Sequence, residues 1–293
     1  MGYKTMDANE AVSRVSYKFT EIAGIYPITP ASPMAEKVDV LASKGEINFW
    51  GNKVKVIEME SEKGAIATVH GALQAGVLAT TYTASQGLLL MIPSIYKMAG
   101  EMLPGVIHVA ARSLSTHSLS IFGDHQDIYA VRQTGACMLS SSSVEEAYHM
   151  AMVSHLASIK SSLPFINFFD GFRTSHEIDK VKEIDLSKLE TLIDKKALRK
   201  FRDNGMISGA TTRGTAENED VYFQHTESRN GYYTKAIDNV IYYMDKINKI
   251  CKTDYKPFNY YGDKSSDAVI IAMGSVCECI KEVVDDLNKK GKK

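Results

Sequence analysis

The chain has 293 residues, of which 44% are hydrophobic and 24% charged, and it contains seven prolines. Such a chain can bury a sizeable core, enough for one large domain or about two average ones, and disorder throughout is disfavoured. Because 34 Lys and Arg face 35 Asp and Glu, the net charge is −1 and the isoelectric point about 6.7. No basic field would attract duplex DNA or anionic lipid, so neither nucleic acid nor a membrane is an expected partner.

No segment predicts membrane insertion or export. The longest strongly apolar stretch, residues 87–95, is far shorter than the roughly 20 residues of a membrane-spanning helix. The N-terminus has no apolar region of the signal-peptide kind, and the sequence has no Asn-x-Ser/Thr sequon. We therefore expect a soluble, cytoplasmic protein.

The four cysteines are too few for a disulfide framework in a chain of this size. Only Cys277 and Cys279 are close in sequence, and no second Cys or His pair lies near them to complete a metal site. We interpret all four as ordinary buried or half-buried thiols and expect no metal ion bound by this chain.

After a first predicted helix, short apolar runs and helix-period segments alternate from Gly24 to Asp170. The predicted strands are residues 24–28, 54–59, 77–82, 106–111, 136–139 and 164–169. The predicted helices are residues 7–24, 32–45, 61–74, a helix from 85 that Pro93 kinks or breaks, 127–133 and 143–160. Parallel neighbouring strands need crossover connections, so this order predicts an α/β fold with a doubly wound, mainly parallel sheet and helices on both faces.

Residues 174–255 interrupt this rhythm with polar, tyrosine-rich sequence, for which we expect helices and long loops that wrap the domain. The alternation then returns with a predicted strand at 268–273 and an amphipathic helix at 276–288. A lone strand has an edge that needs a partner. This unit therefore either begins a second domain or joins the main sheet or another chain.

Candidate site residues follow the predicted strands, because open parallel sheets bind ligands beyond the carboxyl ends of their strands. These positions supply the hydroxyl of Thr29, the carboxylate of Glu62 and the guanidinium of Arg112, together with Thr83 and Ser85. Arg112 and Thr29 suit a small carboxylate, whereas Glu62 could exchange a proton with a heterocycle nitrogen.

Each of these residues also has an ordinary structural explanation. Glu62 would be favoured in the first turn of a helix by the dipole, Thr29 before Pro30 could be a turn residue, and Arg112 could form a surface ion pair. The His and two Asp between 123 and 127 are compatible with an Asx-turn as well as with a metal site. Walker, Gly-x-Gly-x-x-Gly and His-Glu-x-x-His motifs do not occur, which disfavours nucleotide binding by those routes.

Several motifs, in one order along nearly the whole chain, resemble the N-terminal domain of pyruvate:ferredoxin (flavodoxin) oxidoreductases. They are Tyr26–Pro30, Glu60–Ala72, Thr83–Pro93, Ser120–Asp127, Asp170–His176 and Met273–Cys279. The resemblance implies a pyrimidine-type thiamine diphosphate and pyruvate-binding domain over 1–255, with 174–255 as its wrapping segment. It also implies that 256–293 are the start of a second α/β domain, of the transketolase C-terminal-like kind.

The reaction implied by the resemblance is oxidative decarboxylation of pyruvate with coenzyme A to acetyl-CoA and CO2. Thiamine diphosphate is the implied cofactor, and electrons would pass through iron–sulfur clusters to ferredoxin or flavodoxin. In this family Glu62 would match the glutamate that hydrogen-bonds the aminopyrimidine, and Thr29 and Arg112 would match the residues that hold the pyruvate carboxylate. The family also implies a homodimeric enzyme of anaerobic metabolism.

Other family features do not occur in this sequence. The Gly-Asp-Gly motif that holds magnesium and the diphosphate has only Gly123-Asp124-His125 as its nearest counterpart, and Cys-x2-Cys-x2-Cys runs are missing. We therefore expect Mg and [4Fe–4S] clusters in the remainder of a larger protein or complex, and no activity from this chain alone. Two alternatives stay open: a subunit acting on another 2-oxo acid, and a non-catalytic assembly subunit or remnant.

Overall fold

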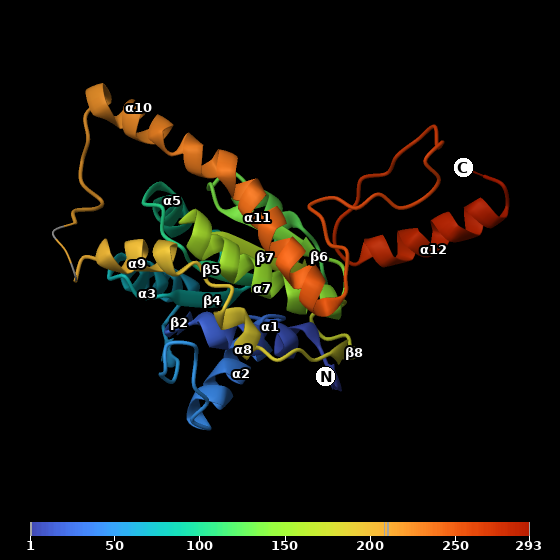
Figure 1. Ribbon diagram of the computed structural model, residues 1–293, viewed down its shortest axis with the longest axis horizontal. Helices are drawn as coiled ribbons and strands as arrows, with labels where there is room; N and C mark the ends of the chain where they lie inside the picture. Colours follow the sequence, from blue (N-terminus) through green and yellow to red (C-terminus); the bar gives the residue numbers. More distant parts are fainter. Residues whose placement is uncertain (1, 208, 210, 293) are drawn as a thin grey trace.

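The computed structural model describes residues 2–207, 209 and 211–292, and its centre is a six-stranded parallel sheet (Figure 1). The strands are β2 (Ile22–Ile25), β3 (Lys55–Glu58), β4 (Ala79–Thr83), β5 (Val106–Ala111), β6 (Cys137–Ser141) and β7 (Phe165–Asp170). They lie in the order β3-β2-β4-β5-β7-β6, and every neighbouring pair is parallel. The predicted doubly wound α/β fold is confirmed.

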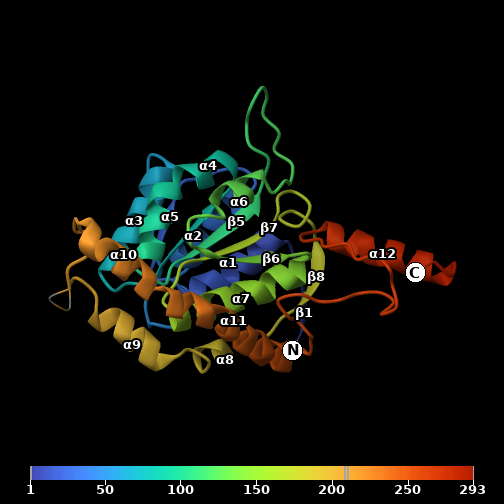
Figure 2. The ribbon, with the colours of Figure 1, turned by 90° about the horizontal axis from the view of Figure 1, so that it is seen from above.

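Helices cover both faces of the sheet (Figure 2). Within the sheet region these are α1 (Ala8–Phe19), α2 (Ser32–Ser43), α3 (Glu62–Gln74), α4 (Ser85–Leu90), α5 (Ile92–Gly100), α6 (Gln126–Val131) and α7 (Val144–Ser161). The later helices are α8 (Ser187–Glu190), α9 (Lys195–Asp203), α10 (Glu219–Ser228), α11 (Asn230–Cys251) and α12 (Val276–Lys289). The chain between 174 and 255 thus supplies helices, of which α11 packs along α7. None of the helices in the described part of the chain is long and apolar enough to cross a membrane.

Capping side chains set several helix starts. Asp7 accepts a hydrogen bond from the Glu10 amide at 2.8 Å, and the hydroxyls of Ser61 and Ser143 cap α3 and α7 in the same way. The predicted break at Pro93 is also confirmed, because α4 ends at Leu90 and α5 begins at Ile92 with the proline in its first turn. A proline there lacks the N–H that a continuous helix would use.

The first predicted strand, 24–28, and the preceding helix, 7–24, have wrong bounds: α1 ends at Phe19 and β2 covers Ile22–Ile25. Gly24 lies inside β2 and does not end a helix. A Cβ at this position would be 2.5 Å from the carbonyl oxygen of Ala65, so the glycine allows α3 to pack closely on the strand.

Two strands escaped prediction, and one predicted strand is wrong. β1 (Tyr3–Met6) and β8 (Asp179–Lys182) form a separate antiparallel pair. Residues 268–273 are not a strand, and Ile271 is 89% exposed, because no neighbouring strand satisfies their backbone groups. The predicted helix after them is confirmed as α12, which projects from the body of the molecule (Figure 1).

Candidate active site

The strand order places the candidate site at the carboxyl edge of the sheet. From β2 the chain moves outward to β3 and then returns to the other side of β2 to form β4 and β5. The order therefore reverses between β2 and β4, and ligands of doubly wound sheets bind at such a switch point. Thr29 follows β2, and Arg112 follows β5.

Thr29 and Arg112, 83 positions apart in sequence, are in direct contact. The Nη1 atom of Arg112 donates a hydrogen bond to the backbone oxygen of Thr29 at 2.6 Å. Because the acceptor is the backbone oxygen, this bond leaves the hydroxyl of Thr29 unused, and Thr29 itself lies in an exposed turn before Pro30. The structure therefore brings the two predicted residues together through the Thr29 carbonyl.

Arg112 is only 6% exposed, so the alternative of a surface ion pair is wrong. Its Nε is buried and has no hydrogen-bond partner in the described part of the chain. Burial lowers the pKa of the guanidinium, and the negative charges of Asp127 and Glu62 oppose that shift. The remaining donor is suited to a carboxylate ligand, since arginine binds carboxylates through paired hydrogen bonds.

Glu62 begins α3 and is 7% exposed. Its carboxylate forms no side-chain hydrogen bond or ion pair with another residue that the structure describes. A Cβ on Gly87 of α4 would be 2.9 Å from Oε1 of Glu62 and 2.6 Å from Oγ1 of Thr83. The carboxylate and this hydroxyl therefore lie close to the glycine, and Oγ1 of Thr83 is buried with no hydrogen-bond partner among the residues that the structure describes.

These groups fit an aminopyrimidine. The ring of thiamine diphosphate would offer a nitrogen that can share a proton with the buried carboxyl group of Glu62, and the Thr83 hydroxyl is a second polar group without a partner in the described part of the chain. The position of Glu62 in the first turn of α3 is also favourable to a carboxylate through the helix dipole, so the structural explanation and the functional one apply together.

Asp127 belongs to this edge as well, although the sequence suggested only an Asx-turn or a metal site there. Its buried carboxylate accepts hydrogen bonds from the amides of Ser85, Arg112 and Ile128 at 2.8–3.0 Å. Burial raises its pKa to about 6. The Asx-turn is present one turn earlier, where Asp124 accepts from the Gln126 amide at 2.9 Å. The only signal for Asp127 in the sequence was its place in a motif of the resemblance.

Asp170 links the same edge to the C-terminal segment. One of its oxygens lies 2.6 Å from Nε2 of His125, and the other accepts hydrogen bonds from the amide and hydroxyl of Ser275. The bond to Asp170 raises the pKa of His125. Gly274 has a φ of +80°, and a Cβ there would be 2.7 Å from the Asp170 carboxylate, so the turn needs glycine.

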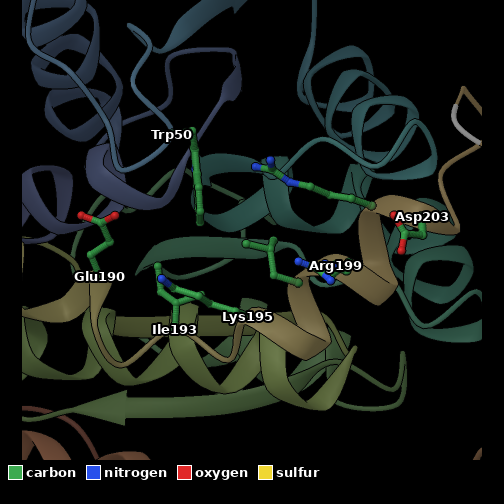
Figure 3. Close-up of a pocket in the computed structure, with 8 residues that line it drawn as sticks. Trp50, Glu190, Ile193, Lys195, Arg199 and Asp203 are labelled. Atoms are coloured by element: carbon green, nitrogen blue, oxygen red, sulfur yellow. The ribbon is translucent and has the colours of Figure 1, made fainter.

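The described surface also has a cavity of about 300 Å³ beside Trp50 (Figure 3). It lies near the amino ends of the strands, since Trp50 precedes β3, and the rest of its lining comes from the end of α8, the turn after it and α9. Arg202 stacks on the indole with its guanidinium carbon 4.9 Å from the ring centre. None of the predicted site residues lines this cavity, which is therefore separate from the candidate site.

Comparison with solved structures first defines the class of fold. The chain is similar to a 2-oxoglutarate:ferredoxin oxidoreductase from Magnetococcus marinus, with a TM-score of 0.67 over 100% of this chain and 52% of that chain. The sequences are 18% identical, so this likeness shows the fold alone.

The chain belongs to the pyruvate flavodoxin/ferredoxin oxidoreductase family, whose thiamine diphosphate-binding domain model matches residues 14–245. It is 55% identical over 291 residues to pyruvate-flavodoxin oxidoreductase of Klebsiella pneumoniae. The matched region is 99% of this chain and 25% of that protein. It is 50% identical over 294 residues to pyruvate:ferredoxin oxidoreductase of Moorella thermoacetica. The matched region is 100% of this chain and 25% of that protein. The chain thus spans about a quarter of the length of these curated relatives.

Proposed function

We propose that this chain forms the pyruvate-binding and aminopyrimidine-binding face of a pyruvate:ferredoxin or pyruvate:flavodoxin oxidoreductase. The complete reaction converts pyruvate and coenzyme A to acetyl-CoA and CO2, and two electrons pass to the carrier. The observation that carries the proposal is the contact of the buried Arg112 with the turn at Thr29. The charge of the buried Glu62, which has no side-chain partner among the described residues, also acts on this guanidinium.

Arg112 would bind the carboxylate of pyruvate. Its Nη1 is already held by the Thr29 carbonyl, so the guanidinium is oriented before substrate arrives, and its buried Nε remains free to donate. The Thr29 hydroxyl adds a neutral donor from the exposed turn. A fixed arginine loses little conformational freedom on binding, which supports recognition of a small anion.

Glu62 would hold a proton at the ring nitrogen of the aminopyrimidine. When bound, thiamine diphosphate supplies the nucleophilic carbon that attacks the 2-oxo group and accepts the electron pair released with CO2. The burial of Glu62 excludes competing water, and the missing side chain of Gly87 leaves room for this carboxylate and the Thr83 hydroxyl. Proton exchange by a positioned carboxylate of this kind contributes about 10²- to 10⁴-fold to a rate.

The other parts of the reaction belong to the longer protein. Magnesium, [4Fe–4S] clusters and the coenzyme A site are proposed for the regions that relatives have beyond this segment, and the complete enzyme is proposed to be a cytoplasmic homodimer. The names of the two relatives include different carriers, flavodoxin and ferredoxin, and this segment gives no basis for choosing between them.

The test uses the complete polypeptide that carries this segment, purified without oxygen, with dye reduction as the readout. We expect activity that depends on both pyruvate and coenzyme A, and weaker activity with bulkier 2-oxo acids such as 2-oxoglutarate. Preference for a larger acid would support the alternative substrate. A native polypeptide close to 32.4 kDa with no oxidation of any 2-oxo acid would support the non-catalytic alternative.

Substitutions at Arg112 and Glu62 test the assigned roles. We expect Arg112→Ala to raise the KM for pyruvate by about 10- to 100-fold, since a charged hydrogen bond contributes about 1.5–3 kcal/mol. Glu62→Gln should lower kcat by at least about 100-fold. The matched controls, Arg132→Ala and Glu60→Gln, replace exposed residues and should retain wild-type kinetics. Unchanged kinetics in the first two variants would contradict the proposed function.

A further inference from the structure

The Asp127 carboxylate joins two neighbouring strand ends. Asp127 is completely buried at the start of α6. Its Oδ2 accepts from the Ser85 amide at 2.8 Å and from the Arg112 amide at 3.0 Å, while Oδ1 accepts from the Ile128 amide at 2.8 Å. Ser85 lies just beyond β4 and Arg112 just beyond β5, where the backbone hydrogen bonds of the sheet stop.

Ser85 has a backbone conformation that needs such support. Its φ of +50° is uncommon for a residue with a side chain, and it persists only where surrounding contacts determine it. The Ser85 hydroxyl also donates to the Ser113 carbonyl at 2.6 Å, which gives a second connection between the same two loops. The start of α4 is therefore fixed against the segment that follows β5.

Both halves of the candidate site depend on these two strand ends. From the end of β5, the Arg112 side chain extends to the Thr29 carbonyl. Beyond the end of β4, α4 begins and places Gly87 near Glu62. One carboxylate therefore connects the backbone that carries the proposed substrate group with the backbone that supports the proposed cofactor group.

We propose that Asp127 is a positioning residue that sets Arg112 relative to Glu62, which rests on the function proposed above. A carboxylate has enough lone pairs to serve all three amides. An asparagine has one acceptor oxygen. Its NH2 group is a donor and cannot accept a hydrogen bond from a backbone N–H. Asp127→Asn therefore keeps the shape of the side chain but breaks at least one of the three bonds.

The experiment compares Asp127→Asn with Asp124→Asn in the complete enzyme and measures kcat and KM for pyruvate. Asp124 lies three residues earlier, just before α6, and is exposed. Within the described residues its carboxylate accepts one hydrogen bond, from the Gln126 amide, so it is a matched control. We expect Asp127→Asn to raise the KM by about 10-fold or more and to lower kcat, since a lost bond to a charged group is worth about 1.5–3 kcal/mol. The control should change the KM by less than about 2-fold, the usual range for a surface substitution.

The KM separates positioning from a purely structural role, because it does not depend on how much of a preparation is folded. A wild-type KM for Asp127→Asn, with a raised KM for Arg112→Ala, overturns this proposal and leaves the proposed function intact. An unchanged KM for Arg112→Ala overturns the proposed function itself.

A stabilised background covers the case in which Asp127→Asn does not fold. Gly71 lies in the exposed interior of α3 with open space around a Cβ, so Gly71→Ala should stabilise the helix by about 1 kcal/mol. The double variant is then measured in the same assay. If it also fails to fold, Asp127 acts in folding and the positioning role is overturned.

Discussion

Gly87 lies where the backbone of α4 meets the Glu62 carboxylate. A Cβ there would be 2.8 Å from Cγ of Glu62 and 2.6 Å from Oγ1 of Thr83, distances too short for real contacts. Within the helix, alanine would otherwise be favoured over glycine by about 1 kcal/mol. The absence of a side chain at this position therefore gives Glu62 its place.

We expect Gly87→Ala to lower the kcat of the complete enzyme by about 10-fold or more, because the added methyl group would push the Glu62 carboxylate out of the position that the reaction needs. Gly71→Ala is the matched control, since it adds the same methyl group to an exposed helical position with no neighbour within 4 Å. Gly87→Ala with wild-type kcat would show that Glu62 needs no such space. The measurement is pyruvate-dependent dye reduction at saturating pyruvate.

Among single residues, the reasons for success and failure differ. Thr29, Glu62 and Arg112 could be predicted because each follows an apolar strand, and the structure places them at one edge. The burial of Arg112 could not be predicted, since an arginine without a known partner is most often exposed. Asp127 was missed as a partner of Ser85 because its three bonds go to backbone amides, which any residue type supplies.

At the scale of elements, Asp170 connects the end of β7 to the start of α12. It accepts two hydrogen bonds from Ser275, and Ser142 adds a bond of 2.7 Å to Glu278 on the same helix. Most of the chain between α11 and α12 is exposed. The N-terminus of α12 thus depends on a few polar contacts and little apolar burial.

We expect Asp170→Asn to increase local opening of α12 by about 10- to 100-fold, because bonds to a charged acceptor are worth about 1.5–3 kcal/mol. Hydrogen exchange of the 275–282 amides in this chain measures that opening. Asp267→Asn, an exposed substitution in the same segment, should leave exchange unchanged. Equal exchange in both variants would show that apolar contacts hold the helix instead.

Local signals predicted some elements and failed for others. The caps at Asp7, Ser61 and Ser143 and the break at Pro93 act within one helical turn, so the sequence contains their cause. β1 and β8 are only four residues each and pair across the whole length of the domain, so no local pattern reveals them. Residues 268–273 have a strand pattern without a strand, since pairing is a property of two segments.

For the molecule as a whole, buried histidines predict sensitivity to acid. His108 and His155 are in contact at 3.1 Å between their Nε2 atoms in the core, and His149 is buried beside Tyr255. Burial lowers the pKa of His108 to about 3, that of His149 to about 4 and that of His155 well below its usual value. Below about pH 6.5 the unfolded chain therefore binds protons that the folded chain does not.

The free energy of unfolding should consequently fall as the pH falls, by about 1.4 kcal/mol per histidine for each pH unit below about 6.5. Asp127 and His125 oppose this trend, because the raised pKa of each lets the folded state bind a proton first. Between pH 7.5 and 5.5 we expect a net loss of at most about 3 kcal/mol, measured by urea unfolding of this chain. His149→Gln should reduce the loss by about 1.4 kcal/mol, whereas His117→Asn, at an exposed position, should not. A free energy that does not change with pH would contradict the neutral state of these histidines.

By itself the sequence determined the parts whose causes lie close together in the chain. Alternating apolar runs and helix periods specified the six parallel strands and the helices between them, and the order of motifs identified the family. Only the tertiary structure decided the strand order β3-β2-β4-β5-β7-β6, the contact of Arg112 with Thr29 and the closeness of Gly87 to Glu62. Those features depend on distances between residues far apart in the chain, and such distances are set by how the layers pack together, which no local pattern encodes.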